Sequence, residues 1–189
     1  MAPPRSSGHG LFPRRRVLGR AGALACAMLL PWRWAAAAHV VRAWPADRPV
    51  PPLEVTDLAG KPWHLEALAG HVVLLNFWAT WCEPCRLEMP SLDAMAERRR
   101  GDGVAVAAVN YRERADVVRR YLEHAPFRSP VLLDSDGDAT FAWTPRVFPT
   151  TVIVGRGGQP VHVVVGELDW ESAEARTLID PLVGPPGRS

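Results

Sequence analysis

The chain has 189 residues, of which 48% are hydrophobic and 22% are charged, and its formal net charge is +2. Residues 1–38 contain six arginines and no acidic residue, so the rest of the chain carries 16 basic and 20 acidic residues, a net charge of −4. This length is enough for one domain with its own core, which excludes a small fold that depends on disulfide bonds. The negative charge of the remaining chain excludes a basic surface for binding nucleic acid.

The first 38 residues have the pattern of an export signal peptide. Basic residues come first, an uncharged run follows from Ala21 to Trp32, and small residues from Ala35 to Ala38 precede the expected cleavage site. The uncharged run has 12 residues, whereas a membrane span needs about 20, so a retained anchor is the weaker interpretation. Arg14 to Arg16 also resemble a twin-arginine signal, which leaves the export route open. Either route predicts a periplasmic or other extracytoplasmic location.

Residues 39–52 are rich in proline and are expected to form an extended lead-in to a domain at 53–183, with a flexible tail at 184–189. Hydrophobic patterning within the domain predicts alternating strands and helices. In chain order these are a hairpin at 53–56 and 63–65, a strand at 71–78, a helix at 83–99, a strand at 104–109, a helix at 115–124, a strand at 131–133, a short helix at 138–143, a hairpin at 150–154 and 161–165, and a helix at 170–180. This order predicts an α/β three-layer sandwich, with a mixed central sheet, helices on both faces and an N-terminal β-hairpin.

The strand at 71–78 runs directly into Cys82-Glu83-Pro84-Cys85, and the following helix is expected to begin between the two cysteines. Two thiols with this spacing on a first helical turn can close a disulfide without moving the backbone. The unpaired N–H groups and the dipole of the helix favour a thiolate at Cys82. We therefore expect Cys82 to be the nucleophile and Cys85 the resolving thiol. Pro84 suits the first turn of a helix, whereas the charge of Glu83 opposes the ionisation of Cys82.

A Cys-x-x-Cys pair can also be half of a zinc site, which needs a second pair of cysteine or histidine ligands. The one other cysteine, Cys26, lies in the signal segment, and the histidines are scattered singly, so we expect no metal of this kind. Soft thiolates also select copper(I), and His64 and His71 precede the strand that leads to the cysteines. A copper-binding or metallochaperone module that uses Cys82 and Cys85 as ligands is therefore the alternative function. The Pro-x-x-x-Thr-x-x-Cys pattern of peroxide-reducing redoxins is absent from the sequence.

Three motifs stand out along the domain: Phe77 to Trp81 before the cysteine pair, Pro90 inside the predicted helix, and Phe148 to Thr151 before the last hairpin. By these motifs residues 50–183 resemble the thioredoxin superfamily, in particular its exported TlpA/ResA-like and DsbE-like members. The resemblance implies a thioredoxin-like fold and an enzyme, a thiol:disulfide oxidoreductase, whose redox group is the Cys82–Cys85 disulfide and which needs no cofactor. It also implies a protein disulfide or thiol as substrate, often in cytochrome c maturation or a similar thiol-dependent assembly, and a membrane electron donor of the DsbD or CcdA kind. A disulfide reductant is the expected direction, with an oxidant left open.

The resemblance implies a proton-transfer role for one acid. Glu88 lies one helical turn after Cys85 and corresponds to an acid near the thiols, which can take a proton from Cys85 as that thiol attacks the mixed disulfide. Spacing alone leaves an ordinary exposed helix acid open. Thioredoxin carries a buried Asp at the position of Asn76, and because Asn does not titrate, Glu88 is the leading candidate.

The resemblance also implies a substrate site around one proline. Pro149 corresponds to the cis-proline that faces the dithiol, and the backbone around it can pair with an extended substrate segment. The residues expected to contact the substrate are Trp81, Glu83, Pro84, Phe148, Pro149 and Thr150. Those expected to form walls of the active-site region are Trp78, Trp81 and Trp143.

Overall fold

The computed structural model describes residues 39–184, so the predicted signal peptide at 1–38 and the tail beyond residue 184 lie outside the described residues. Its strands are β1 Val40–Ala43, β2 Val55–Asp57, β3 Pro62–Trp63, β4 Val72–Trp78, β5 Val104–Tyr111, β6 Val131–Asp134, β7 Thr150–Val154 and β8 Pro160–Val165. Its α-helices are α1 Glu83–Arg99, α2 Ala115–His124, α3 Asp138–Trp143 and α4 Ala173–Val183, with 3-10 turns η1 Leu65–Leu68 and η2 Arg100–Asp102. Within residues 39–184, no helix has both the length and the apolar character needed to cross a membrane.

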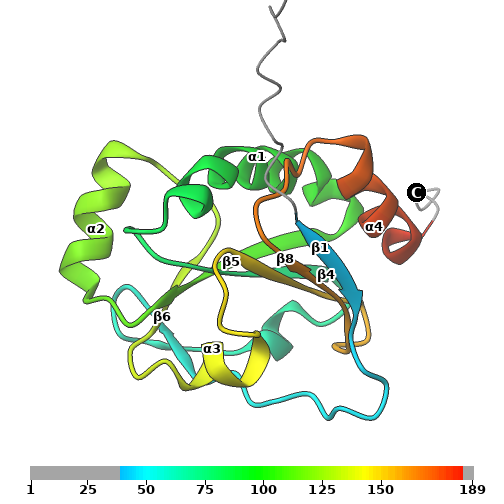
Figure 1. The fold of residues 1–189 in the computed structure, drawn as a ribbon, viewed down its shortest axis with the longest axis horizontal. Helices are drawn as coiled ribbons and strands as arrows, with labels where there is room; N and C mark the ends of the chain where they lie inside the picture. Colours follow the sequence, from blue (N-terminus) through cyan, green and yellow to red (C-terminus); the bar gives the residue numbers. More distant parts are fainter. Residues whose placement is uncertain (1–38, 185–189) are drawn as a thin grey trace, which may run out of the picture. The chain divides into compact units, whose positions relative to one another are not determined.

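The eight strands form one mixed sheet in the order β1-β8-β7-β4-β5-β6-β2-β3. β4, β5 and β6 run parallel to one another, and the other neighbouring strands pair antiparallel. Figure 1 shows α1 and α4 on one face of this sheet and α3 on the other. The predicted three-layer α/β sandwich with a mixed sheet is therefore confirmed.

The central strand β4 divides the core in two, because successive residues of a strand point to opposite faces. Every residue of β4 is buried. Val73, Leu75 and Phe77 pack with Trp143 of α3, whereas the alternate residues face the side that α1 and α4 cover. The expectation that Trp143 forms a wall of the active-site region is wrong. Its ring lies in the core opposite α1, with its centroid 5.8 Å from that of Trp44.

Most predicted elements are confirmed with small changes at their ends. α1, α2 and α3 have the predicted bounds, and β2 pairs with β3 as the predicted hairpin. α4 begins at Ala173 and not at Trp170, because the Ser172 side chain caps it by accepting the Ala175 backbone N–H at 3.1 Å. Trp170 and Glu171, which precede this cap, therefore belong to the preceding loop.

Strand β1 is absent from the predicted elements, because it lies in the segment expected to be a proline-rich lead-in. Val40 to Ala43 pair antiparallel with β8, with Val40 opposite Val165. These residues precede Pro45, the first proline of the segment, and their two valines favour a strand. The described sheet therefore begins at Val40 and not at residue 53.

Candidate active site

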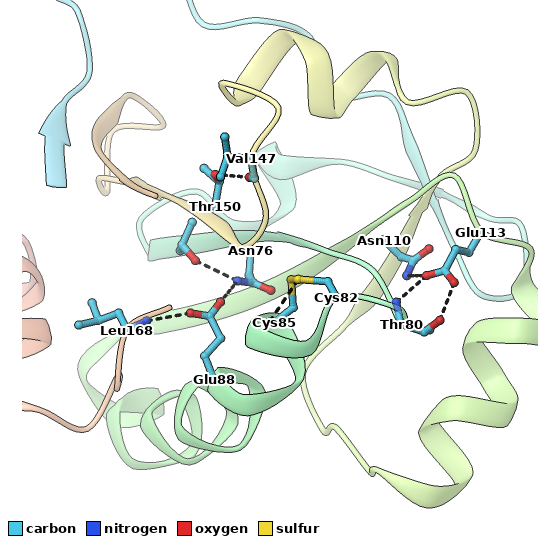
Figure 2. Close-up of a disulfide and its surroundings, with 11 residues drawn as sticks. Asn76, Thr80, Cys82, Cys85, Glu88, Asn110, Glu113, Val147, Thr150 and Leu168 are labelled. Carbon is cyan, nitrogen blue, oxygen red and sulfur yellow. Dashed lines mark hydrogen bonds between the residues drawn. A yellow bond between two sulfur atoms is a disulfide. The ribbon is translucent and has the colours of Figure 1, made fainter. Parts of the chain in front are cut away.

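Cys82 and Cys85 form a disulfide at the start of α1, just beyond the carboxyl end of β4 (Figure 2). Cys82 is the N-cap residue of α1, and its sulfur accepts the backbone N–H of Cys85 at 3.3 Å. Pro84 occupies the first turn, where its missing N–H leaves no helical hydrogen bond unmade. Cys82 is 6% exposed and Cys85 is completely buried. An incoming thiol or disulfide therefore reaches the pair through Cys82.

The surface around the disulfide is aromatic. Trp81 precedes Cys82 and is 63% exposed, and its ring meets that of Phe148 edge to face at a centroid distance of 5.9 Å. Phe148 also packs against the core cluster that contains both cysteines. Trp78 lies in the same cluster, fully buried, as expected for a wall of this region. Glu83 is exposed between the cysteines.

The loop before β7 lies at the same end of the sheet as the disulfide. The peptide bond between Phe148 and Pro149 is cis, as the resemblance implies. Thr150 of β7 is paired with Phe77 of β4, so Pro149, the residue before Thr150, lies level with the end of β4. The hydroxyl of Thr150 is buried and donates to the Val147 carbonyl at 2.6 Å. Thr150 therefore supports the loop with its side chain and does not present that side chain to solvent.

A buried polar group lies beneath the disulfide (Figure 2). Glu88 is 2% exposed, and its carboxylate accepts hydrogen bonds from the Asn76 amide at 2.6 Å and from the Leu168 backbone N–H at 3.2 Å. The Asn76 amide also donates to the hydroxyl of Thr151 at 2.9 Å. Asn76 points to the face of β4 that α1 covers, so the strand and the helix bring it to Glu88. Of the two interpretations of Glu88, an exposed helix acid is wrong.

Burial raises the pKa of Glu88 to about 8, because a charged carboxylate is poorly solvated there. The hydrogen bonds from Leu168 and Asn76 favour the carboxylate and lower the pKa. The indole N–H of Trp170, which has no partner within normal hydrogen-bond geometry among the described residues, has the same effect. The nearby charge of Glu167 raises the pKa further. Glu88 is therefore mostly protonated at neutral pH and titrates close to where a thiol does.

A second acid, Glu113, was missed by the sequence analysis. Its carboxylate accepts the backbone N–H of Thr80 at 2.7 Å, the hydroxyl of Thr80 at 2.5 Å and the Asn110 amide at 2.8 Å. Thr80 lies two residues before Cys82, so Glu113 holds the segment that leads into the disulfide (Figure 2). β5 runs parallel to β4, and residues after neighbouring parallel strands meet at one edge of the sheet. That rule is the signal that could have identified Glu113.

The two histidines considered for copper lie away from the cysteines. His71 precedes β4 and the cysteines follow it, so the length of the strand, about 20 Å, separates them. His64 lines the same cleft as His71. Among residues 39–184, no three His, Cys, Asp or Glu side chains are grouped in a way that could hold a metal ion.

Comparisons with known proteins agree with this geometry. A model of the AhpC/TSA family matches residues 46–162. The chain is 32% identical to a thiol-disulfide oxidoreductase ResA of Bacillus cereus over 124 residues, 66% of this chain and 72% of that protein. It is 35% identical to ResA of Bacillus subtilis (strain 168) over 118 residues, 62% of this chain and 66% of that protein.

A crystal structure from Chlorobium tepidum, of a protein assigned as the thiol:disulfide interchange protein DsbE, superimposes with a TM-score of 0.66 at 26% identity. The superposition covers 71% of this chain and 94% of that one, so the fold is thioredoxin-like. The family model matches more than half of the chain, and the ResA relatives are named thiol-disulfide oxidoreductases. The chain belongs to the AhpC/TSA family, in which it is a ResA-like thiol-disulfide oxidoreductase with the redox pair Cys82–Cys85.

Proposed function

We propose that this protein is an extracytoplasmic disulfide reductant, in which Cys82 attacks the substrate, Cys85 resolves the intermediate and Glu88 transfers the proton. The observation that carries the proposal is the buried carboxyl of Glu88, one helical turn from a buried cysteine, with a pKa of about 8. A free thiol has a pKa of about 8.5, so the two groups exchange a proton at little cost.

The reaction has two exchange steps. In the reduced enzyme, the Cys82 thiolate attacks one sulfur of a substrate disulfide, forming a mixed disulfide, and the other substrate sulfur leaves as a thiolate that takes up a proton. Cys85 then loses its proton and attacks the Cys82 sulfur, which releases the second substrate sulfur. Two electrons pass from the cysteine pair to the substrate, and the product is the Cys82–Cys85 disulfide seen in the structure.

The second step needs help because Cys85 is completely buried, and burial disfavours its thiolate. The Glu88 carboxylate is the base that takes the proton. Asn76 supports this route: its amide nitrogen donates to Glu88, and its amide oxygen is buried without a partner among residues 39–184. Figure 2 shows the Asn76 amide between Glu88 and the disulfide. When Cys85 is reduced, its S–H can donate to that oxygen and stay close to the base.

Substrate contacts are assigned to the exposed rim of the disulfide. Trp81 and Phe148 offer aromatic surface, Glu83 and Pro84 lie between the cysteines, and the backbone around Pro149 is the part that an extended segment can pair with. Thr150 contributes indirectly, because its hydroxyl is used to hold the loop.

The compartment and the partners belong to the same proposal. The signal-like pattern of residues 1–38 supports export, with cleavage after Ala38 and a mature domain that ends near residue 183. A reductant in an oxidising compartment needs electrons from across the membrane, so we assign the reset to a membrane donor of the DsbD or CcdA kind. Cytochrome c maturation, or a similar assembly that needs reduced thiols, is the role that fits such an enzyme.

Cysteine substitutions test the order of attack. Cys85→Ala is expected to accumulate a covalent mixed disulfide with a protein substrate, detectable by mass spectrometry, because Cys82 attacks and nothing resolves the product. Cys82→Ala is expected to abolish turnover without trapping substrate, because Cys85 is buried. Equal trapping by the two variants would contradict the assigned roles.

A redox titration in thiol/disulfide buffers, read by tryptophan fluorescence, tests the direction. A two-electron couple near or below the thioredoxin value of about −270 mV is expected for a reductant. A couple near −120 mV would identify an oxidant instead. The absence of any such couple would favour the copper-binding alternative, in which the two thiols act as ligands.

A further inference from the structure

Four aromatic side chains form a row that begins beside the disulfide. The ring of Trp81 meets Phe148 at a centroid distance of 5.9 Å, Phe148 meets Tyr111 at 5.2 Å, and Tyr111 meets Phe141 at 5.8 Å. The two end members are the most open, with Trp81 63% and Phe141 38% exposed. Val147, next to this aromatic row, is also exposed. An apolar surface therefore extends from the cysteines, and it is long enough to contact several residues of an extended bound segment.

Two arginines cover the far part of the aromatic row. The guanidinium of Arg146 lies 4.3 Å from the ring centroid of Phe141, and that of Arg112 lies 5.8 Å from the ring centroid of Tyr111. Within residues 39–184, neither arginine is within 4 Å of a carboxylate oxygen. The Tyr111 hydroxyl, and to a smaller extent the charges of Asp136 and Asp134, raise the pKa of Arg112, so the charge of Arg112 is partly balanced. Arg146 has the less compensated charge.

The backbone holds both arginines in an unfavourable conformation. Arg112 has φ 56° and Arg146 has φ 66°, and they are the only non-glycine residues with positive φ in the described part of the chain. Residues other than glycine rarely adopt this left-handed backbone conformation. They keep it where the surrounding structure enforces it. Gly137 is part of that structure, because a Cβ there would lie 2.7 Å from the Tyr111 ring and 2.9 Å from the Arg112 side chain.

We infer that the aromatic row and its two arginines bind an extended segment of the client protein that carries an acidic side chain near the cysteine under attack. This inference rests on the proposed function and specifies its substrate class. Arg146 has no carboxylate oxygen within 4 Å among residues 39–184, so this end of the aromatic row carries a positive charge to which a client carboxylate is complementary, whereas Asp134 and Asp136 act on Arg112. Arg is suited to this role because it stacks on a ring and still presents N–H groups to a carboxylate.

The spacing of the aromatic row sets where the acid should lie. Each step between rings is 5.2–5.9 Å, and an extended chain advances about 3.3 Å per residue, so one step corresponds to roughly two residues. Arg112 lies over Tyr111, two steps from Trp81, and Arg146 lies over Phe141, three steps from Trp81. The acidic residue is therefore expected roughly four to six positions from the attacked cysteine, with apolar side chains between them.

Paired model peptides test this inference. Each peptide contains one disulfide and a short extended segment, and the pair differs only by Asp or Asn about five residues from the cysteine. The reduced protein is expected to reduce the Asp peptide at least fivefold faster in kcat/KM than the Asn peptide, with the preference shrinking at high salt. Arg146→Gln is expected to remove most of the preference and Arg112→Gln a smaller part. Arg42→Gln, at an exposed arginine of the edge strand β1, is the control and should keep it.

The outcomes separate the two proposals. Bis(2-hydroxyethyl) disulfide is small and neutral, so the control Arg42→Gln should reduce it as the unmodified protein does. If neither peptide nor this small disulfide is reduced, the proposed function fails. The inference about acidic clients is overturned if both peptides are reduced at the same rate. It is also overturned if the double variant Arg146→Gln/Arg112→Gln keeps the preference for Asp. In either case the proposed function as a disulfide reductant is unaffected.

Discussion

At the scale of single residues, Glu88 is the group whose chemistry depends most on its surroundings. An exposed Glu has a pKa near 4.5 and would be fully ionised at neutral pH, whereas burial raises the pKa of Glu88 to about 8. At neutral pH most Glu88 carboxyl groups carry a proton, and a minority are carboxylates. Such a carboxylate can accept the proton of Cys85 when that thiol becomes a thiolate.

Glu88→Gln is expected to slow the resolving step by about 10²-fold, because the amide keeps the shape of the side chain but cannot take a proton. The measurement is the decay of a preformed mixed disulfide on Cys82, followed from pH 5 to 10. The unmodified protein should show an inflection near pH 8 that the variant lacks. Identical pH profiles would show that Glu88 is not the base.

The sequence identified Glu88 by its spacing from Cys85 together with the resemblance to exported thioredoxin-like reductants. It did not show the burial, because Leu168 and Trp170 reach the carboxyl from a loop about 80 residues further along the chain. Asn76 was recognised as a residue that cannot titrate, but its hydrogen bond to Glu88 depends on how β4 packs against α1. Contacts between distant segments decide the pKa, and periodicity within one segment does not report them.

At the scale of elements, the entry to α1 is held from the neighbouring strand. Glu113, just after β5, binds both the backbone N–H and the hydroxyl of Thr80. Without this carboxylate the segment between β4 and Cys82 would lose two hydrogen bonds, and Asn110 of β5 would lose a third, in a region that is partly closed to water. Glu113 is thus a positioning residue that acts through Thr80.

Glu113→Ala is expected to lower the free energy of unfolding by about 1–3 kcal/mol and to speed hydrogen exchange at the Thr80 amide, because that N–H loses its acceptor. Glu113→Gln keeps one side-chain oxygen and should restore part of both effects. Glu123→Gln, an exposed acid on α2, is the matched control. Unchanged exchange at Thr80 in Glu113→Ala would refute the positioning role, whatever the loss of stability.

The ends of elements were predictable where local signals are strong. The Cys82 cap and Pro84 mark the start of α1, and its predicted and observed bounds agree. α4 was placed three residues early because apolar residues such as Trp170 extend the helical pattern into the loop before the Ser172 cap. β1 was missed because a short edge strand is defined by its partner β8, which lies more than 100 residues away in sequence.

At the scale of the whole molecule, Glu88 links stability to pH. Its pKa is raised on folding from 4.5 to about 8, so between these values the folded state binds a proton that the unfolded state does not. Stability from this group is fully present below pH 4.5, decreases as pH rises through this window, and is constant above pH 8. The slope is at most about 1.4 kcal/mol per pH unit.

Chemical denaturation of the oxidised protein between pH 5 and 9 measures this link, because the disulfide-bonded cysteines do not titrate. The difference in stability between Glu88→Gln and the unmodified protein is expected to shift in favour of the variant as pH rises to 8, since Gln carries no charge to bury. A difference that stays constant across this range would show that the pKa of Glu88 is not raised by folding.

The position of β1 has a consequence for how the mature chain must begin. With cleavage after Ala38, His39 alone precedes β1, and its ring nitrogen lies 2.7 Å from a carboxylate oxygen of Glu174 on α4. A cut after Ala43 would remove the whole strand and expose the edge of β8 that faces away from β7, and such an edge is a template for joining one copy to another. β8 begins more than 100 residues after β1, so β1 can pair with it only once that length of chain has been synthesised.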